Sequence, residues 1–186
     1  MNRMMVALGS SLAVVALASQ ASGPTNVRVD AERLARVVEE VEGLRSLRSR
    51  LAESFTGEPD QSTFARVCKP VGERPRELSR EHGWSIQQLA ERYRNPAHRL
   101  DPEAQRVSDM MERDPGLMGL WLDTEVNGKP GVRYFRRIVV EEACLACHGP
   151  RDARPEFIKR AYPEDRAYDF DVGDLRGLYA VFVPES

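Results

Sequence analysis

The sequence predicts an α+β fold, because helical patterns come first along the chain and strand patterns follow them. The clearest helix is expected over residues 30–55, where apolar side chains recur every three or four positions. A β-hairpin is expected over residues 117–140, around the turn dipeptide Asn127-Gly128. A last strand is expected at residues 177–183. Strands that follow helices, rather than alternate with them, form antiparallel sheets in this class.

The first helix carries terminal signals and a long apolar stripe. Asp30 suits the N-cap position, and Glu32 places a negative charge in the first turn, where the helix dipole favours it. Thr56-Gly57 marks the expected end. The stripe over residues 30–55 is nearly heptad in spacing. It therefore either packs on its own domain or also pairs with a second copy of the chain to form a homodimer.

A second helix is expected at residues 61–71. Pro70 and Pro75 are predicted to separate it from a short piece at residues 76–81, because proline removes a backbone donor and clashes with the preceding turn. One face of this helix is apolar and contains a thiol; its members are Phe64, Val67, Cys68 and Val71. The thiol is therefore expected to point inward.

Three later segments have weaker signals. Residues 84–93 are ambiguous, since the middle has helical propensity while Trp84 and Tyr93 favour a strand. Residues 102–113 are expected to form a helix with proline in its first turn. Pro130-Gly131 is expected to lengthen the hairpin loop.

Residues 1–21 match a secretory signal peptide. Arg3 lies beside the amino terminus, residues 6–18 are apolar and small, and residues 19–21 offer a small-x-small cleavage site. Cleavage near Ala21 would leave residues 22–186 as one exported, periplasmic domain. An uncleaved N-terminal membrane anchor is the alternative, although the apolar run is short for a membrane span.

The motif CLACH at residues 144–148 carries the clearest chemical signal. Cys-x-x-Cys-His is typical of covalent c-type haem attachment: the thiols of Cys144 and Cys147 add to the haem vinyl groups, and the imidazole of His148 binds iron. With Cys68, these residues could also supply the ligands of a zinc site, but zinc motifs usually have two separated ligand pairs. A thioredoxin-like redox pair is a further alternative, but it would require a βαβ setting.

Cys68 remains unassigned by this motif. A third thiol in an exported protein is either a small buried apolar residue, a link to another chain, or a metal ligand. Its place on an apolar helix face favours the core or a ligand role over a reactive surface thiol.

Several strings resemble a family of exported c-type haem proteins with a PAS-like α+β fold, long labelled a domain of unknown function. Members occur as free periplasmic proteins or as sensor regions of signalling proteins. The similarity spans residues 30–184 in the right order, and CLACHG at residues 144–149 is its most specific part. The other strings are FARVCKP at 64–70, Gly83-Trp84, RNP at 94–96, DPE at 101–103, Tyr134-Phe135, YPED at 162–165 and GDLRG at 173–177.

The resemblance implies a PAS-like antiparallel sheet, one covalent haem c, and Cys68 as the second axial ligand opposite His148. Competing residues for that second position are His82, His98, Met110, Met111 and Met118, and an open position is a further possibility. Arg94 and Arg176 lie in matching segments and are candidates for binding the haem propionates.

These observations lead to a functional hypothesis. Iron bound by His and Cys should have a low potential and should exchange its thiolate on reduction, which suits a sensor of redox state or of a diatomic gas. A periplasmic electron-transfer cytochrome is the alternative. The formal net charge of −2 argues against a nucleic-acid partner. No hydrolase or nucleotide-binding motif occurs, so enzymatic activity is not expected.

Overall fold

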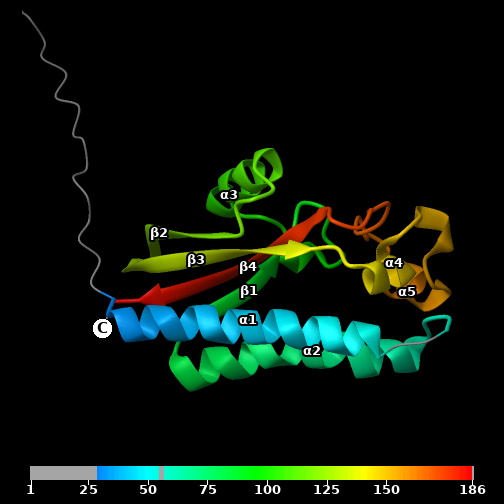
Figure 1. The fold of residues 1–186 in the computed structure, drawn as a ribbon, viewed down its shortest axis with the longest axis horizontal. Helices are drawn as coiled ribbons and strands as arrows, with labels where there is room; N and C mark the ends of the chain where they lie inside the picture. Colours follow the sequence, from blue (N-terminus) through cyan, green and yellow to red (C-terminus); the bar gives the residue numbers. More distant parts are fainter. Residues whose placement is uncertain (1–28, 55–56, 186) are drawn as a thin grey trace, which may run out of the picture.

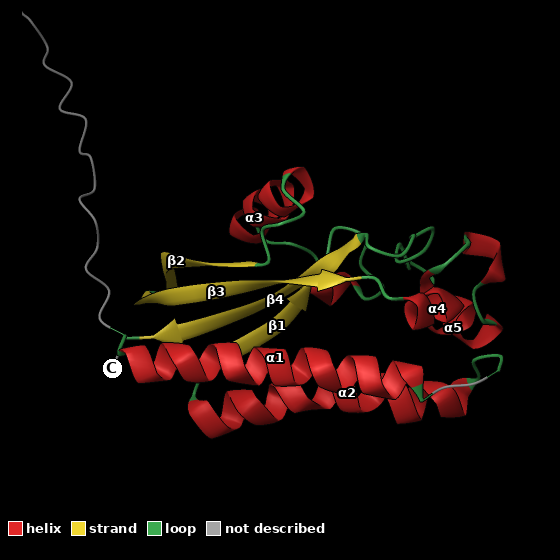
Figure 2. Cartoon of the chain, in the orientation of Figure 1, coloured by secondary structure: helices red, strands yellow, loops and turns green. Residues whose placement is uncertain are grey.

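The computed structural model describes residues 29–54 and 57–185. Two long helices, α1 (Ala31–Glu53) and α2 (Gln61–His82), lie on one side of a four-stranded antiparallel sheet, and α3 (Pro102–Arg113) lies on the other (Figures 1 and 2). The strand order is β1-β4-β3-β2. The strands are β1 (Ser85–Leu89), β2 (Gly119–Val126), β3 (Lys129–Val139) and β4 (Leu175–Pro184). The predicted α+β class is therefore confirmed.

Short helical segments join the ends of the sheet. Between β1 and α3 lies η1 (Pro96–His98), and the long connection from β3 to β4 contains the others. These are η2 (Glu142–Cys144), α4 (Leu145–His148), η3 (Arg151–Ala153) and α5 (Glu156–Ala161). In Figure 1, α4 and α5 lie beyond the end of the sheet and above one end of α1 and α2.

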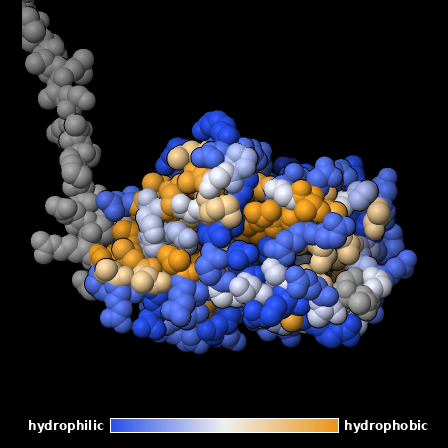
Figure 3. Space-filling model, viewed as in Figure 1, coloured by the Kyte–Doolittle hydropathy of each residue, from blue (hydrophilic) through white to orange (hydrophobic). Residues whose placement is uncertain are grey.

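The apolar stripe of α1 packs on the sheet. Asp30 caps the helix by accepting a hydrogen bond from the Arg33 backbone N at 2.9 Å. Val37, Val41 and Leu44 are buried in a cluster with side chains of α2, β3 and β4. The outer side of α1 and α2 is mainly hydrophilic in the view of Figure 3. This packing accounts for the stripe, and pairing with a second copy stays a prediction; residues 55–56, at the predicted helix end, lie outside the described residues.

The predicted break in α2 is wrong. The helix continues through Pro70 and Pro75 as far as His82. A capping box fixes its start: the Thr63 backbone N donates to the Asp60 carboxylate at 2.7 Å, and Thr63 Oγ1 accepts from the Asp60 backbone N at 3.2 Å. Val71, Pro75 and Leu78 are buried. Packing of this second half offsets the two backbone hydrogen bonds that proline cannot make.

Pairing between strands also determines the structure of two segments. The sequence left residues 85–89 ambiguous, and it assigned Pro130-Gly131 to a loop. Residues 85–89 form a strand, because β1 pairs with β4 along its whole length and this pairing overrides local helical propensity. Asn127 and Gly128 form a two-residue turn with φ values of 54° and 75°, as a type I′ hairpin requires. Pro130-Gly131 lies within β3, so the expected longer loop is wrong.

No helix among residues 29–54 and 57–185 is long and apolar enough to cross a bilayer. The predicted signal peptide or anchor at residues 1–21 falls outside the described residues.

A bulge disturbs the start of β4. Ile138 pairs with Gly177 and Val139 with Leu175, so Arg176 is the extra residue of the bulge. Gly177 has a φ of 154°, and a Cβ atom there would collide with the Leu89 carbonyl oxygen. Glycine at this position is what allows β1 and β4 to approach each other.

Gly177→Ala should therefore destabilise the fold by about 2–3 kcal/mol, the cost of forcing an extra methyl into a packed site. Urea denaturation of the purified protein measures the effect. Gly72→Ala is the matched control, since a Cβ there meets nothing within 4 Å and alanine favours the helix. Equal midpoints for Gly177→Ala and the wild type would contradict the role given to this close approach.

Candidate functional site

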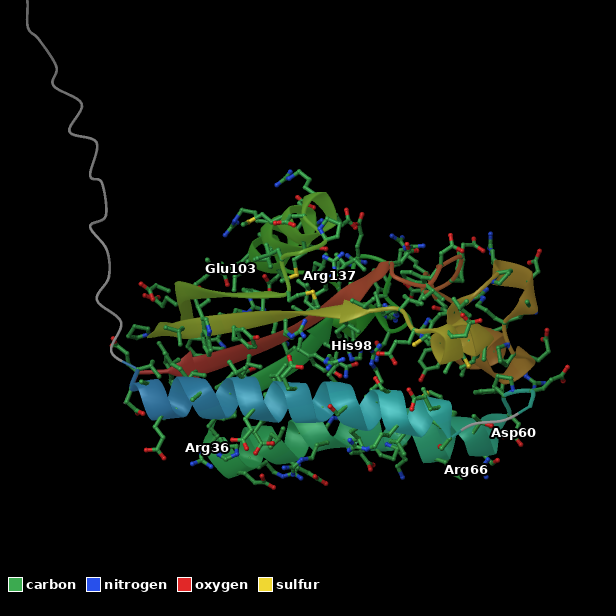
Figure 4. All side chains as sticks on the ribbon, in the orientation of Figure 1. Arg36, Asp60, Arg66, His98, Glu103 and Arg137 are labelled. Atoms are coloured by element: carbon green, nitrogen blue, oxygen red, sulfur yellow. The ribbon has the colours of Figure 1, made fainter. Side chains whose placement is uncertain are left out.

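One cavity brings together most of the residues that the sequence singled out. Its volume is about 500 Å³, within the roughly 300–1,000 Å³ typical of cofactor pockets. Side chains from α1, α2, β1, η1, β3, η2, α4, α5 and β4 line it. Its wall includes Cys68, Arg94, His98, Cys144, Cys147, His148 and Arg176. In Figure 4, His98 lies toward the end of the sheet nearest α4.

The Cys-x-x-Cys-His motif forms a short, well-fixed helical turn. Cys144 ends η2, and α4 follows directly with Cys147 and His148. The turn is held by backbone bonds from Cys144 N to Glu141 O at 2.9 Å and from Gly149 N to Leu145 O at 2.8 Å. Residues three apart in a helix share one face, so both thiols face the same side. Both are free thiols and half-buried.

His148 is held in one tautomer by the segment that wraps around α4. Its Nδ1 lies 2.8 Å from the Ala167 carbonyl oxygen, which can only accept, and 3.3 Å from Arg94 Nη2, which can only donate. The shorter contact favours the tautomer with the hydrogen on Nδ1. Nε2 therefore keeps the lone pair needed by a metal. Burial, followed by the nearby charges of Arg176 and Arg94, holds the pKa of His148 well below its usual range. The imidazole is thus neutral at physiological pH and ready to act as a ligand.

Arg94 holds α4 in place by a hydrogen bond to its backbone. Its Nη2 donates to the Cys147 carbonyl oxygen at 2.6 Å, and its Nε donates to Asp165 at 3.3 Å. Asp165 is 1% exposed and also accepts from Arg154 at 2.7 Å. The guanidinium of Arg94 is therefore already bound to acceptors of the protein. Sequence reasoning missed Asp165, although it lies in the YPED string that the family resemblance had already identified.

Arg94→Gln should lower stability by about 2 kcal/mol, because hydrogen bonds to charged groups are lost while Asp165 stays buried. Chemical denaturation of the apo-protein measures this loss without any contribution from a bound group. Arg160→Gln, at an exposed position of α5, is the control and should change little. If both variants unfold at the same denaturant concentration, the hydrogen bonds of Arg94 to Cys147 and Asp165 do not stabilise the fold.

Cys68 lies on the wall of the cavity supplied by α2. The predicted apolar face is correct in direction, but it lines an open cavity instead of the packed core, so the Cys68 thiol is exposed to that cavity. The surrounding cavity walls desolvate the thiol and, with a further effect of Cys147, raise the pKa of Cys68 to about 11. Phe64, one turn earlier, contacts Phe157 and Tyr162 at ring-centroid distances of 6.2 and 6.5 Å. These rings connect the start of α2 to α5 across the cavity.

The other proposed iron ligands lie elsewhere, apart from His98. His82 stacks on Trp84 with 4.3 Å between ring centroids, and its Nε2 lies 3.8 Å from Glu40. Met111 is buried beneath the sheet with other α3 side chains. Met110 and Met118 are 44% and 41% exposed. None of these four residues lines the cavity.

Two alternative uses of the thiols find little support in the arrangement. Within the described part of the chain, no three His, Cys, Asp or Glu side chains are close enough to hold a metal ion. The three thiols and His148 therefore do not assemble a four-ligand zinc site. Cys144 and Cys147 follow an antiparallel strand, not the βαβ unit of thioredoxin-like proteins.

Comparison with known proteins agrees with this fold. The model of the Tll0287-like family matches residues 21–184. The crystal structure of the cyanobacterial haem-protein Tll0287 is similar, with 41% sequence identity and a TM-score of 0.77 over 85% of this chain and 98% of that chain. No curated protein sequence matches the chain. The length and coverage of these matches establish that the chain belongs to the Tll0287-like family.

Proposed function

We propose that this chain is an exported, PAS-like, mono-haem c-type protein that senses redox state or a diatomic gas. The observation that carries the proposal is the cavity that Cys68, Cys144, Cys147 and His148 line together. The solved relative is itself a haem protein. Periplasmic location follows from the predicted signal peptide and from the oxidising, export-linked setting in which c-type attachment takes place. Catalysis is not part of the proposal.

The residues present fit a covalent haem. Cys144 and Cys147 share a helix face from which both thiols can form thioether bonds. His148 presents an unprotonated Nε2 beside them. Apolar side chains such as Phe64, Val67 and Phe157 line the cavity and suit a flat apolar ring. The donor set is therefore a histidine and two thiols on one wall and a third thiol on the facing helix.

Cys68 is the residue through which we expect the signal to act. When bound, haem supplies an iron whose charge changes by one on reduction and whose axial positions accept exchangeable ligands. With haem bound, Cys68 would be held as a thiolate in spite of the raised pKa that desolvation gives it in the free protein. Weakening of this effect on reduction would let Cys68 take up a proton and leave its position to a small gas. Release of Cys68 would be transmitted first to α2.

An electron-transfer cytochrome remains the second candidate function. It would keep both axial ligands in both oxidation states, commonly with a methionine that raises the potential. No methionine among the described residues lines the cavity, which favours the sensor.

The first experiment is a pyridine haemochrome spectrum of protein exported from a host with cytochrome c maturation. A c-type spectrum that survives acid–acetone extraction is expected. The reduced protein is then exposed to CO, and its potential is measured. A low potential with CO binding supports the sensor; an unchanged six-coordinate spectrum supports the carrier. Absence of covalent haem would overturn the whole proposal.

A further inference from the structure

Arg176 is a half-buried cation on the cavity wall. The β4 bulge makes it the extra residue of the strand, which re-aims its side chain into the cavity. One bond is formed, from its Nη1 to the Arg92 carbonyl oxygen at 3.0 Å. Within the described residues it forms no ion pair within 4.0 Å, and Asp165, which already binds Arg94 and Arg154, acts on its charge only from farther away. Burial, and next the nearby Arg94, lower its pKa to about 10.

The fully buried arginines of the structure have partners that balance their charge. Arg133 bonds to both Asp101 and Glu103, and Arg136 bonds to Glu42. Arg137 donates to the Met111 carbonyl oxygen at 2.6 Å, in the last turn of α3, where the helix dipole favours a cation. In the cavity itself, Arg94 pairs with Asp165 and Arg48 pairs with Glu141. Arg176 differs from these arginines because it contacts neither a carboxylate nor the last turn of a helix among the described residues.

Further donors in the same wall lack acceptors. Arg48 uses Nη2 for Val139 O and Glu141, while its Nε is buried without a hydrogen-bond partner. The Tyr179 hydroxyl lies near Gln88 without a hydrogen bond of normal geometry. Arg48 is close enough to Arg176 to influence its charge. A buried donor without an acceptor costs free energy, so this cluster of donors needs an acceptor from outside the protein.

We propose that Arg176, with Nε of Arg48, forms a carboxylate-binding subsite inside the cavity, and that this subsite receives one haem propionate. The inference rests on the proposed haem function and deepens it. A carboxylate accepts up to four hydrogen bonds and matches the forked donors of arginine. Of the two arginines in the family-like segments, Arg176 is thus the propionate ligand, while Arg94 holds α4 in position.

The test compares Arg176→Gln with Arg76→Gln in the haem-loaded protein. Arg76 lines the same cavity but is exposed, so it is a matched control for charge alone. Arg176→Gln should lower the equilibrium constant for haem reduction at least tenfold, or 59 mV for one electron, because a half-buried positive charge favours the reduced state. It should also shift the propionate bending mode in the resonance Raman spectrum. Arg76→Gln should change neither quantity.

Several outcomes would overturn the subsite. A lower potential with an unshifted propionate mode would mean that Arg176 acts on the iron charge only, or that a free carboxylate from solution occupies the site. Equal effects of both variants would point to cavity charge in general. If Arg176→Gln does not mature, Arg176→Lys keeps the charge but loses the fork, and its propionate mode must still shift. Wild-type protein without covalent haem would overturn subsite and function together; loaded wild type with an unaltered Arg176→Gln would overturn the subsite alone.

Discussion

Replacing both Cys144 and Cys147 with serine should abolish covalent haem attachment. The two thiols are the only groups on the α4 turn that can form thioether bonds, and a hydroxyl does not add to a haem vinyl group under the same conditions. Protein exported from a host with cytochrome c maturation should then lose all haem on acid–acetone extraction, while the wild type keeps it. Stained gels for haem peroxidase activity and pyridine haemochrome spectra measure both properties.

The control is the pair of single variants. Each of Cys144→Ser and Cys147→Ser keeps one thiol and should retain a single thioether bond, with a haemochrome band intermediate between the b-type and c-type positions. A double variant that still carries extraction-resistant haem would contradict the attachment site. A double variant with normal folding but no haem would show that the apo-fold is independent of attachment.

Replacing Cys68 with serine should raise the haem potential and shift the ferric Soret band. A thiolate stabilises ferric iron, so its loss favours reduction. The expected rise is on the order of 100 mV, a fraction of the roughly 0.8 V that axial ligands span. Spectroelectrochemical titration measures the potential, and ferric electron paramagnetic resonance reports the ligand directly. An unchanged Soret band and potential would exclude Cys68 as a ligand.

Lys69→Ser is the matched control for this variant. Lys69 is the next residue of α2, lines the same cavity and is 64% exposed. Its loss removes a charge near the cavity but no sulfur. The control should therefore leave the Soret band in place. His98→Ala adds a second comparison, because His98 is the other sequence-predicted candidate that lines the cavity.

The candidate haem-attachment motif was recognisable from the sequence because its residues are local. Cys144, Cys147 and His148 lie within one helical turn, and their spacing alone indicates the reaction that they support. The hairpin at Asn127-Gly128 was predictable for the same reason, since the turn residues themselves require positive φ. Features of this kind depend on neighbouring residues in the sequence and not on contacts with distant segments.

Other features depend on contacts between distant segments. Arg176 is the extra residue of a bulge because β3 and β4 shift register beside it, and Asp165 holds α4 in place because Arg94 and Arg154 converge on it. The helical tendency of residues 85–89 yields to pairing with β4. No pattern within a single segment contains this information, so sequence reasoning could name Arg94 and Arg176 but could not assign their different roles.

The two prolines of α2 have a mechanical consequence. Pro70 and Pro75 leave the carbonyl groups of Arg66 and Val71 without their usual helical donors, so the helix is less stiff just after Cys68. Beyond Pro70 the helix is anchored in the core by Pro75 and Leu78, although part of this half also borders the cavity, whereas Phe64, Val67 and Cys68 before Pro70 line the cavity. The part of α2 with the missing hydrogen bonds therefore lies between Cys68 and the part of the helix that is buried in the core. A displacement at Cys68 would bend α2 locally at little cost, leaving the sheet and its packing undisturbed.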